Sequence, residues 1–234
     1  MIAETARRTP LRLAHRGDWR FAPENTTAAL LAAMRVPGCD GVEFDVRLSR
    51  DGVPVILHDE TLSRIQGHPW RVDQLDAVAL AEHAIPSLAE ALAALPRTAW
   101  LNVELKGDAH GEATAGVLRA ARGDAPANAV VSSFEVPTMA AMADWLPGWG
   151  RWLAAFDLAP ATLSLALGLG CRGLSVPWGA ITPASMRAAT AGGLEVAAWT
   201  VRRRPTFERL GRLGVIACCV EAAALGDPVK EARR

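Results

Sequence analysis

The stretch GVEFDVRLSRDGVPVILHD, residues 41–59, joins two β-rich apolar runs through a short polar turn. Glu43 and Asp45 are two residues apart, so in an extended strand their carboxylates point to one face and Phe44 to the other. About five residues join the two runs, too few for a parallel crossover, which needs roughly a dozen. The runs should therefore pair as an antiparallel hairpin, and folding the chain at this turn is expected to bring His58 opposite Glu43.

Outward from this hairpin, short apolar runs alternate with helix-like segments to the end of the chain. Capping residues or prolines precede the alanine- and leucine-rich segments. They predict helices over residues 26–35, 87–95, 113–122, 137–145, 160–169, 183–191 and 205–213. With the second hairpin arm set aside, the strands begin near residues 11, 41, 99, 129, 151, 173, 194 and 215.

Eight strand–helix units in a chain of 234 residues predict an α/β fold, a closed (β/α)8 TIM barrel. We expect a single domain over residues 1–234, with the β-hairpin after the second strand. The alternative is an open, doubly wound parallel sheet. That fold would need a glycine-rich phosphate-binding turn after the first strand, and residues 16–25 (RGDWRFAPEN) do not form one.

The composition narrows the class of protein. The formal net charge is zero and no long basic run occurs, which argues against nucleic-acid binding. No apolar stretch is long enough for a signal peptide or a membrane span, so we expect a cytoplasmic protein without membrane insertion. The four cysteines lack the spacing of a zinc site or a disulfide framework and are expected to be small buried residues. The sequence leaves the oligomeric state open.

Several polar side chains fall where the predicted strands end. In a barrel, catalytic groups lie at the C-terminal ends of the strands, which converge on one rim. Each of these residue types is common on protein surfaces, but together they predict a single site. The candidates are His15 and Arg16 after the first strand, Glu43 and Asp45 on the second, His58 on the hairpin arm, and Glu104 and Lys106 on the third.

These residue types indicate metal-assisted phosphoryl transfer on a small anionic molecule. Three carboxylates with no cysteine nearby favour one hard divalent cation, Mg²⁺ or Ca²⁺, over zinc. Arg16 and Lys106 suit a phosphate, the first as a planar fork and the second as a point charge. His15 and His58 titrate near neutrality and suit a general acid and a general base.

The same residues lie in motifs that resemble a known family. The motifs are HRG (15–17), PENT (23–26), GVEFDV (41–46), VILHD (55–59), IPSL (85–88) and VELK (103–106). They resemble those of the glycerophosphodiester phosphodiesterases, most densely over residues 13–106, with weaker matches at 132–134 and 198–201. The resemblance implies a TIM barrel that hydrolyses glycerophosphodiesters to glycerol 3-phosphate and an alcohol, using a divalent metal.

The resemblance also implies roles for individual residues. It makes Glu43, Asp45 and Glu104 the metal ligands, His15 and His58 the acid–base pair, Arg16 and Lys106 the phosphate contacts, and Phe134 and Trp199 apolar walls beside the substrate. For the two aromatic residues, plain packing at the barrel rim is an equal alternative. The resemblance leaves open which histidine is the acid, and whether the metal is Mg²⁺ or Ca²⁺.

The sequence departs from the family pattern on the later strands. Arg202 stands where the family has Asn, and residues 214–221 (GVIACCVE), with Cys218, Cys219 and Glu221, lack the Thr-Asp-x-Pro-like turn. Residues 60–85 form a short segment, which predicts an open site. Three alternatives remain: a barrel phospholipase acting on lipid phosphodiesters, a non-catalytic phosphodiester-binding barrel, and a metal-dependent amidohydrolase. The last would require histidine ligands on later strands.

Overall fold

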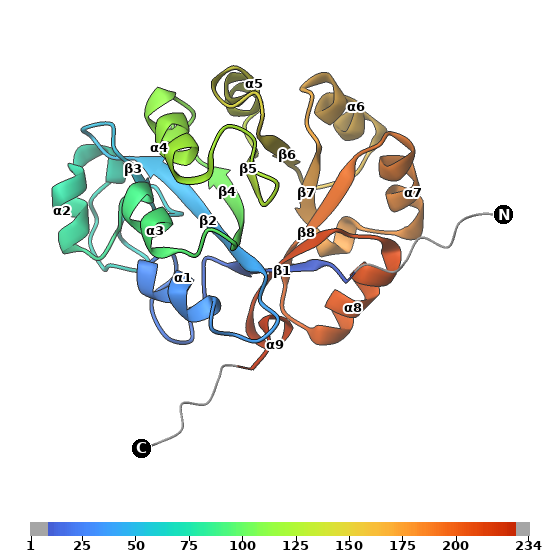
Figure 1. Ribbon diagram of the computed structural model, residues 1–234, viewed down its shortest axis with the longest axis horizontal. Helices are drawn as coiled ribbons and strands as arrows, with labels where there is room; N and C mark the ends of the chain where they lie inside the picture. Colours follow the sequence, from blue (N-terminus) through green and yellow to red (C-terminus); the bar gives the residue numbers. More distant parts are fainter. Residues whose placement is uncertain (1–8, 228–234) are drawn as a thin grey trace.

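Parallel strands follow one another around a closed sheet in the computed structural model, which describes residues 9–227. Strand β1 pairs with both β2 and β9, which closes the sheet, and helices surround it (Figure 1). The parallel strands are β1 (Leu11–His15), β2 (Gly41–Leu48), β4 (Trp100–Leu105), β5 (Ala129–Ser133), β6 (Gly150–Ala154), β7 (Gly173–Pro177), β8 (Glu195–Val201) and β9 (Ala217–Val220). The predicted (β/α)8 TIM barrel is confirmed, and the open doubly wound sheet is excluded.

The predicted hairpin is present, but with a different register. Strand β3 (Pro54–Ile56) pairs antiparallel to β2, with Val46 opposite Ile56. Continuing this register sets residue 58 opposite Phe44, so the predicted pairing of His58 with Glu43 is wrong by one residue. The reason is the turn, which is centred on Asp51 because the backbone N–H of Ser49 donates to the carbonyl of Val53.

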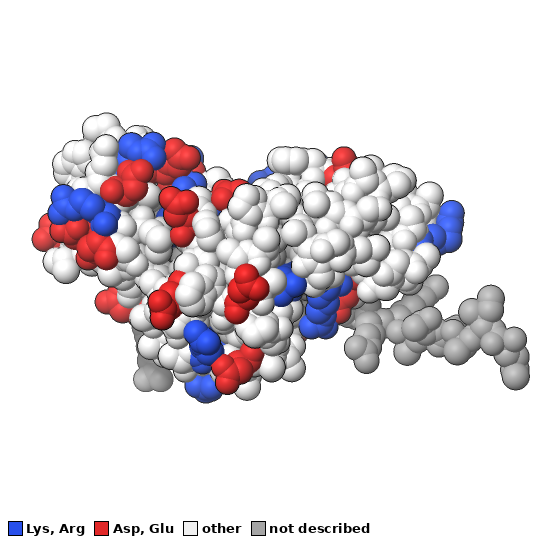
Figure 2. All heavy atoms as spheres, turned by 90° about the horizontal axis from the view of Figure 1, so that it is seen from above, with Lys and Arg blue, Asp and Glu red and all other residues white. Residues whose placement is uncertain are grey.

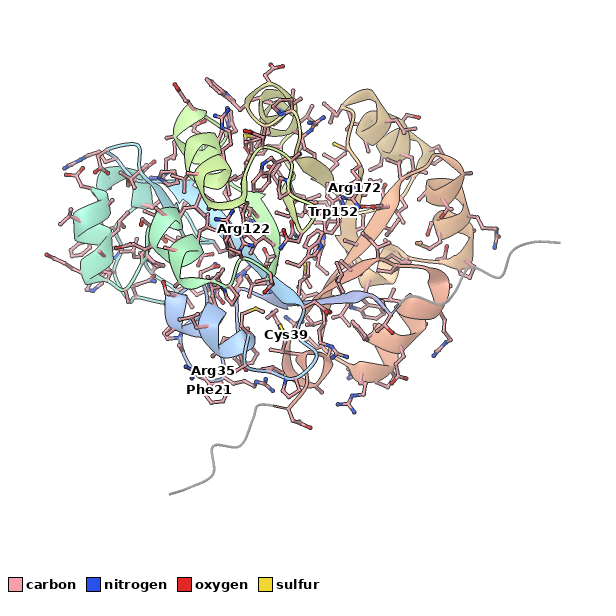
Figure 3. All side chains as sticks on the ribbon, in the orientation of Figure 1. Phe21, Arg35, Cys39, Arg122, Trp152 and Arg172 are labelled. Atoms are coloured by element: carbon pink, nitrogen blue, oxygen red, sulfur yellow. The ribbon has the colours of Figure 1, made fainter. Side chains whose placement is uncertain are left out.

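The two faces of each strand pack into different environments, as a period of two residues requires. Outward-facing residues such as Phe44 pack against the helices in one large core. Inward-facing residues, among them Leu13 and Trp152, form a second cluster inside the barrel. Trp152 lies among the strands in Figure 3 and stacks on Trp100 with ring centroids 5.2 Å apart. Because Glu43 is next to Phe44 in β2, its side chain points into the barrel.

All seven predicted helices are observed, with each end within two residues of the expected one. The Thr26 hydroxyl accepts a hydrogen bond from the Ala29 backbone N–H and caps the first helix. The helices are α1 (Thr27–Ala33), α3 (Leu88–Ala94), α4 (Glu112–Arg122), α5 (Val136–Trp145), α6 (Pro160–Gly168), α7 (Pro183–Ala191) and α8 (Arg204–Leu213). Within residues 9–227, no helix is long and apolar enough to cross a membrane. The assignment of residues 1–234 to one domain stays a prediction, and both chain ends lie outside the described residues.

Short helices add to the predicted pattern. They are η1 (Val72–Gln74), α2 (Ala77–Glu82), η2 (Trp178–Ala180) and α9 (Ala222–Leu225). Helix α2 belongs to the segment after the hairpin, which packs on β3 through a small separate core that includes Val55, Leu62 and Leu80. These helices have at most six residues, too short to show a helical period in the sequence.

The surface charges are unevenly distributed. Figure 2 shows one face on which acidic and basic side chains gather toward one end, while much of the rest is uncharged. Helices α5 and α6 contain a single charged residue, Asp144.

The four cysteines are free, and three of them are buried while Cys39 is half-buried.

Candidate active site

A sharp turn at the end of β1 directs two of the candidate side chains into the barrel mouth. Arg16 and Gly17 both have left-handed backbone conformations, with φ of 58° and 84°. A Cβ atom on Gly17 would lie 2.5 Å from the carbonyl carbon of Ala29, so only glycine fits there. The turn places the Arg16 Nε atom 3.1 Å from Asp45 Oδ2, and the Arg16 backbone N–H donates to Glu43 Oε2.

Three carboxylates meet where β2 and β4 lie side by side. The strand register sets Asp45 opposite Glu104, and Glu43 points to the same face as Asp45. One oxygen from each of Glu43, Asp45 and Glu104 lies within 4.8 Å of the others. The Asn25 side-chain amide donates to Asp45 Oδ2 at 2.9 Å, which fixes that carboxylate. Glu43 Oε1 is buried and has no hydrogen-bond partner among residues 9–227.

The pKa values of Glu43 and Asp45 shift in opposite directions, because their surroundings differ. Burial raises the pKa of Glu43 to about 8 despite the nearby His15, and Asp45 adds repulsion. Burial would also raise the pKa of Asp45, but Lys106 and Arg16 outweigh it and lower this pKa to about 2. The Lys106 Nζ atom lies 3.1 Å from Asp45 Oδ1 and also contacts Glu104.

This donor set fits a hard divalent cation. All three candidate ligands offer carboxylate oxygens, which Mg²⁺ and Ca²⁺ prefer. A cation would relieve the repulsion among the acids, and it would give the unpartnered Glu43 Oε1 a partner. The acidic cluster is therefore compatible with the predicted metal.

Both histidines contact a carboxylate through the same ring nitrogen. His15 Nδ1 lies 2.5 Å from Glu221 Oε1, and His58 Nδ1 lies 2.7 Å from Asp59 Oδ1. Burial lowers the pKa of His58, against the opposing effect of Asp45 and Asp59. For His15, Glu43 and Glu221 outweigh burial and raise the pKa. In each ring the Nε2 atom remains for contacts in the cavity.

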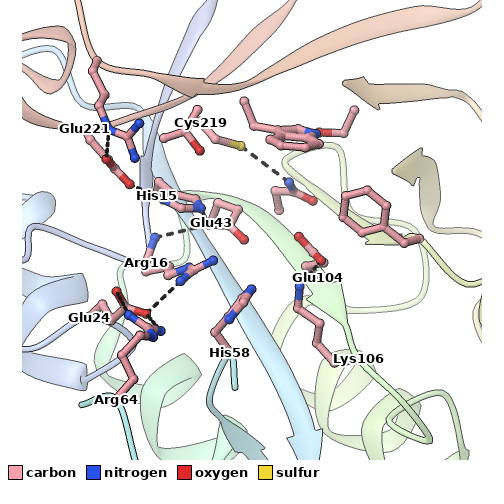
Figure 4. A pocket seen from close by; sticks show the side chains of 16 residues that line it. His15, Arg16, Glu24, Glu43, His58, Arg64, Glu104, Lys106, Cys219 and Glu221 are labelled. Carbon is pink, nitrogen blue, oxygen red and sulfur yellow. Dashed lines mark hydrogen bonds and ion pairs between the residues drawn. The ribbon is translucent and has the colours of Figure 1, made fainter. Parts of the chain in front are cut away.

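A cavity of about 490 Å³ lies over the carboxylates (Figure 4). Its wall includes eight of the nine side chains predicted from the sequence; the ninth, Asp45, is fully buried behind them. The eight are His15, Arg16, Glu43, His58, Glu104, Lys106, Phe134 and Trp199. The model of the glycerophosphoryl diester phosphodiesterase family matches residues 15–224, which contain every one of these positions.

The chain belongs to this family. "Probable glycerophosphodiester phosphodiesterase 2" of Mycobacterium tuberculosis is 32% identical over 211 residues, covering 81% of this chain and 78% of the relative. A glycerophosphodiester phosphodiesterase of Caldanaerobacter subterraneus is 54% identical over 52 residues, which cover 22% of this chain and only 21% of that protein. A solved phosphodiesterase from Oleispira antarctica, in complex with its product sn-glycerol-3-phosphate, shares 27% identity with a TM-score of 0.78. That match covers 91% of this chain and 93% of the solved one.

Two residues that line the cavity, Glu24 and Arg64, were not predicted from the sequence as site residues. Glu24 had no predicted role of its own, but it lines the cavity and accepts hydrogen bonds from Arg16 at 2.8 Å and from Arg64 at 2.6 Å. Arg64 comes from the short segment after the hairpin. Glu24 and Asn25 both belong to the PENT motif, so that motif was the available signal.

The later strands contribute the rest of the cavity wall. Phe134 and Trp199 stand edge to face at 5.7 Å, and Phe156 contacts both rings. Phe156 is 72% exposed, which leaves one side of this aromatic group open to solvent. Asn102, Ser175, Thr200, Arg202, Cys219 and Glu221 also line the cavity.

Proposed function

We propose that this protein hydrolyses glycerophosphodiesters to glycerol 3-phosphate and an alcohol, with one divalent metal ion and with His15 and His58 as general acid and general base. The observation that carries the proposal is the convergence of three carboxylates and two histidines on one cavity in a member of this family. The product bound by the Oleispira phosphodiesterase supports glycerol 3-phosphate as the product here.

Glu43, Asp45 and Glu104 would hold the metal. When bound, the ion would offset the negative charge on the phosphoryl oxygens and orient the substrate. The set of carboxylate oxygens suits Mg²⁺ and Ca²⁺ equally. Removing the metal with EDTA should therefore stop the reaction, and adding back each ion alone identifies the one that supports it.

Arg16 and Lys106 would balance the charge of the substrate phosphate. Both cations line the cavity and lie 3.1 Å from Asp45, so they offset the charge of the acidic cluster beside the cavity. Without them, a phosphate diester would approach the three carboxylates with much less compensating positive charge. Arg16 is held in place by Glu24, and Lys106 by Glu104.

His15 and His58 would move the two protons of the reaction. An in-line displacement at phosphorus needs a base behind the attacking oxygen and an acid behind the leaving oxygen. Each ring contacts a carboxylate through Nδ1, so Nε2 is the nitrogen available to exchange a proton with the substrate. Binding alone has no need for two such groups, which favours hydrolysis over a non-catalytic barrel.

The test is release of glycerol 3-phosphate from glycerophosphocholine and glycerophosphoethanolamine with Mg²⁺, with Ca²⁺ and with EDTA. We expect release that depends on the metal and is abolished by EDTA. No release with any metal would contradict the proposed hydrolysis. Metal-dependent binding of these diesters without release would identify the non-catalytic barrel instead.

A second candidate function is hydrolysis of lipid phosphodiesters. The exposed Phe156, in contact with Phe134 and Trp199, gives the cavity an apolar edge on which an acyl chain could pack. Lysophosphatidylcholine and glycerophosphocholine should be compared as substrates in wild type and in Phe156→Ala. Faster turnover of the lysolipid, lost selectively in the variant, would favour the lipid substrate; selective turnover of the water-soluble diester would exclude it.

A further inference from the structure

A chain of three side chains leads from the surface to His15. Glu221 uses both of its carboxylate oxygens: Oε1 lies 2.5 Å from His15 Nδ1, and Oε2 lies 2.7 Å from Arg202 Nε. The Glu221 side chain is 9% exposed, whereas that of Arg202 is 66% exposed. The three residues come from the ends of β1, β9 and β8, which are neighbours in the barrel. Figure 4 shows the Glu221 carboxylate beside the His15 ring.

This contact determines how the imidazole of His15 is presented. A carboxylate only accepts hydrogen bonds, so Glu221 selects the ring form with a proton on Nδ1. In the neutral ring, Nε2 is then a proton acceptor. That atom lies 3.8 Å from Glu43 Oε2, on the side of the carboxylate cluster. The contact also prevents the ring from turning its other edge toward the cavity.

We propose that Glu221 is a positioning residue for His15 and that Arg202 holds the Glu221 carboxylate in place. The inference rests on the proposed function of His15 as general acid or base. Both residues lie where the sequence departs from the family pattern, at position 202 and directly after the last strand. The two departures are thus in direct contact with each other and with a candidate catalytic histidine.

The second histidine has a similar arrangement, which supports this interpretation. Asp59 accepts from His58 through Oδ1 at 2.7 Å and from Arg64 Nε through Oδ2 at 2.5 Å. Both candidate catalytic rings therefore contact a carboxylate that an arginine holds. Carboxylates that orient a histidine in this way contribute to catalysis without touching the substrate.

A purely structural role for the Glu221–Arg202 pair predicts different effects. The pair joins two strands that already share backbone hydrogen bonds, and Arg202 is mostly exposed. Ion pairs with an exposed partner contribute little to stability. Loss of turnover without loss of stability would therefore indicate positioning rather than strand pairing.

The first experiment measures steady-state kinetics of the metal-loaded, full-length enzyme on glycerophosphocholine. Glu221→Ala should lower kcat about 10- to 100-fold, the range known for the carboxylates that support metal-bound histidines, with KM changed less than about threefold. Glu221→Gln should fall between wild type and Glu221→Ala, because its carbonyl can still accept from Nδ1. Arg202→Ala should lower kcat less, Arg202→Lys should recover part of the loss, and adding Arg202→Ala to Glu221→Ala should cause no further loss.

A matched control pair exists at the other end of the barrel. Arg172 and Glu195 form an ion pair of 2.7 Å at the starts of β7 and β8, far along the strands from the cavity. Arg172→Ala and Glu195→Gln should leave kcat unchanged. Equal losses in the control pair and in the Glu221 variants would overturn the positioning role, as would an unchanged kcat in Glu221→Ala.

The second experiment does not depend on turnover. Nitrogen-15 NMR of the histidine rings in the Mg²⁺-loaded protein at alkaline pH reports which ring nitrogen carries the proton. We expect His15 to be protonated on Nδ1 in wild type and to become a mixture of both forms in Glu221→Ala. A His15 ring protonated on Nε2 in wild type would overturn the inference. If wild type releases no glycerol 3-phosphate, the proposed function fails, and this spectrum still decides the positioning role.

Discussion

Replacing Glu43 by glutamine should stabilise the metal-free fold while it removes activity. Glu43 is 2% exposed, and its Oε1 atom has no hydrogen-bond partner within residues 9–227. Burial raises its pKa from the ordinary 4.5 to about 8. A carboxyl group whose pKa rises on folding destabilises the fold once the pH exceeds the ordinary value, and the full penalty applies above the raised pKa. Glutamine keeps the shape of the side chain without its charge, so the variant escapes this penalty.

The size of the effect follows from the same shift. One pKa unit corresponds to about 1.4 kcal/mol, so the rise from 4.5 to about 8 sets an upper limit of about 5 kcal/mol. At about pH 5.5 only about 1.4 kcal/mol of this penalty applies, and at about pH 9 all of it does. The free energy of unfolding of Glu43→Gln should therefore exceed that of wild type by a few kcal/mol more at about pH 9 than at about pH 5.5. A divalent metal at about 100 times its Kd adds about 2.7 kcal/mol to the free energy of unfolding of the protein that binds it. We expect wild type to bind the metal and to gain this stability.

The assay is urea unfolding in EDTA, followed by tryptophan fluorescence at the two pH values. Glu208→Gln, on the exposed side of α8, is the control and should match wild type at both. A Glu43→Gln variant that is less stable than wild type at alkaline pH would refute the reasoning, as would a difference that does not change with pH. The loss of activity in Glu43→Gln is measured as the release of glycerol 3-phosphate with Mg²⁺ and with Ca²⁺.

Three further predictions concern the histidines, the core and the thiols. His15→Ala and His58→Ala should each lower kcat roughly 10²- to 10⁴-fold while metal-dependent thermal stabilisation survives; near wild-type turnover in both would contradict the acid–base assignment. Phe44→Ala should lower the free energy of unfolding by about 3–5 kcal/mol because Phe44 is fully buried. Urea unfolding measures this loss, and Phe21→Ala, at a 61% exposed position, should change it by less than about 0.5 kcal/mol. Burial raises the pKa of Cys218 to about 12, so this thiol should react with a disulfide reagent near neutral pH only after unfolding; rapid labelling of the native protein would show that the thiol is accessible.

The strands, and the face on which the acids of β2 lie, could be predicted from local patterns. The period of two separates Glu43 and Asp45 from Phe44, and this alternation holds in any extended chain. Eight such runs with intervening helices leave few ways to bury both strand faces, and the closed barrel is one of them. The hairpin register could not be predicted to one residue. It depends on the residue at which the turn is centred, and one residue more or less in a turn shifts every pair after it.

The sequence by itself determined the barrel and the positions of the three carboxylates and the two histidines on, or just after, its strands. The reason is that the neighbours of each residue in the chain define the strand to which it belongs. Only the tertiary structure decided what His15 contacts across the barrel. Glu221 lies 206 residues after His15, and the two meet because β9 closes on β1. The shift in the pKa of Glu43 was equally inaccessible, since it depends on burial and on charges from other strands. Contacts of this kind arise from the closure of the barrel, and residue types and spacing along the chain do not encode them.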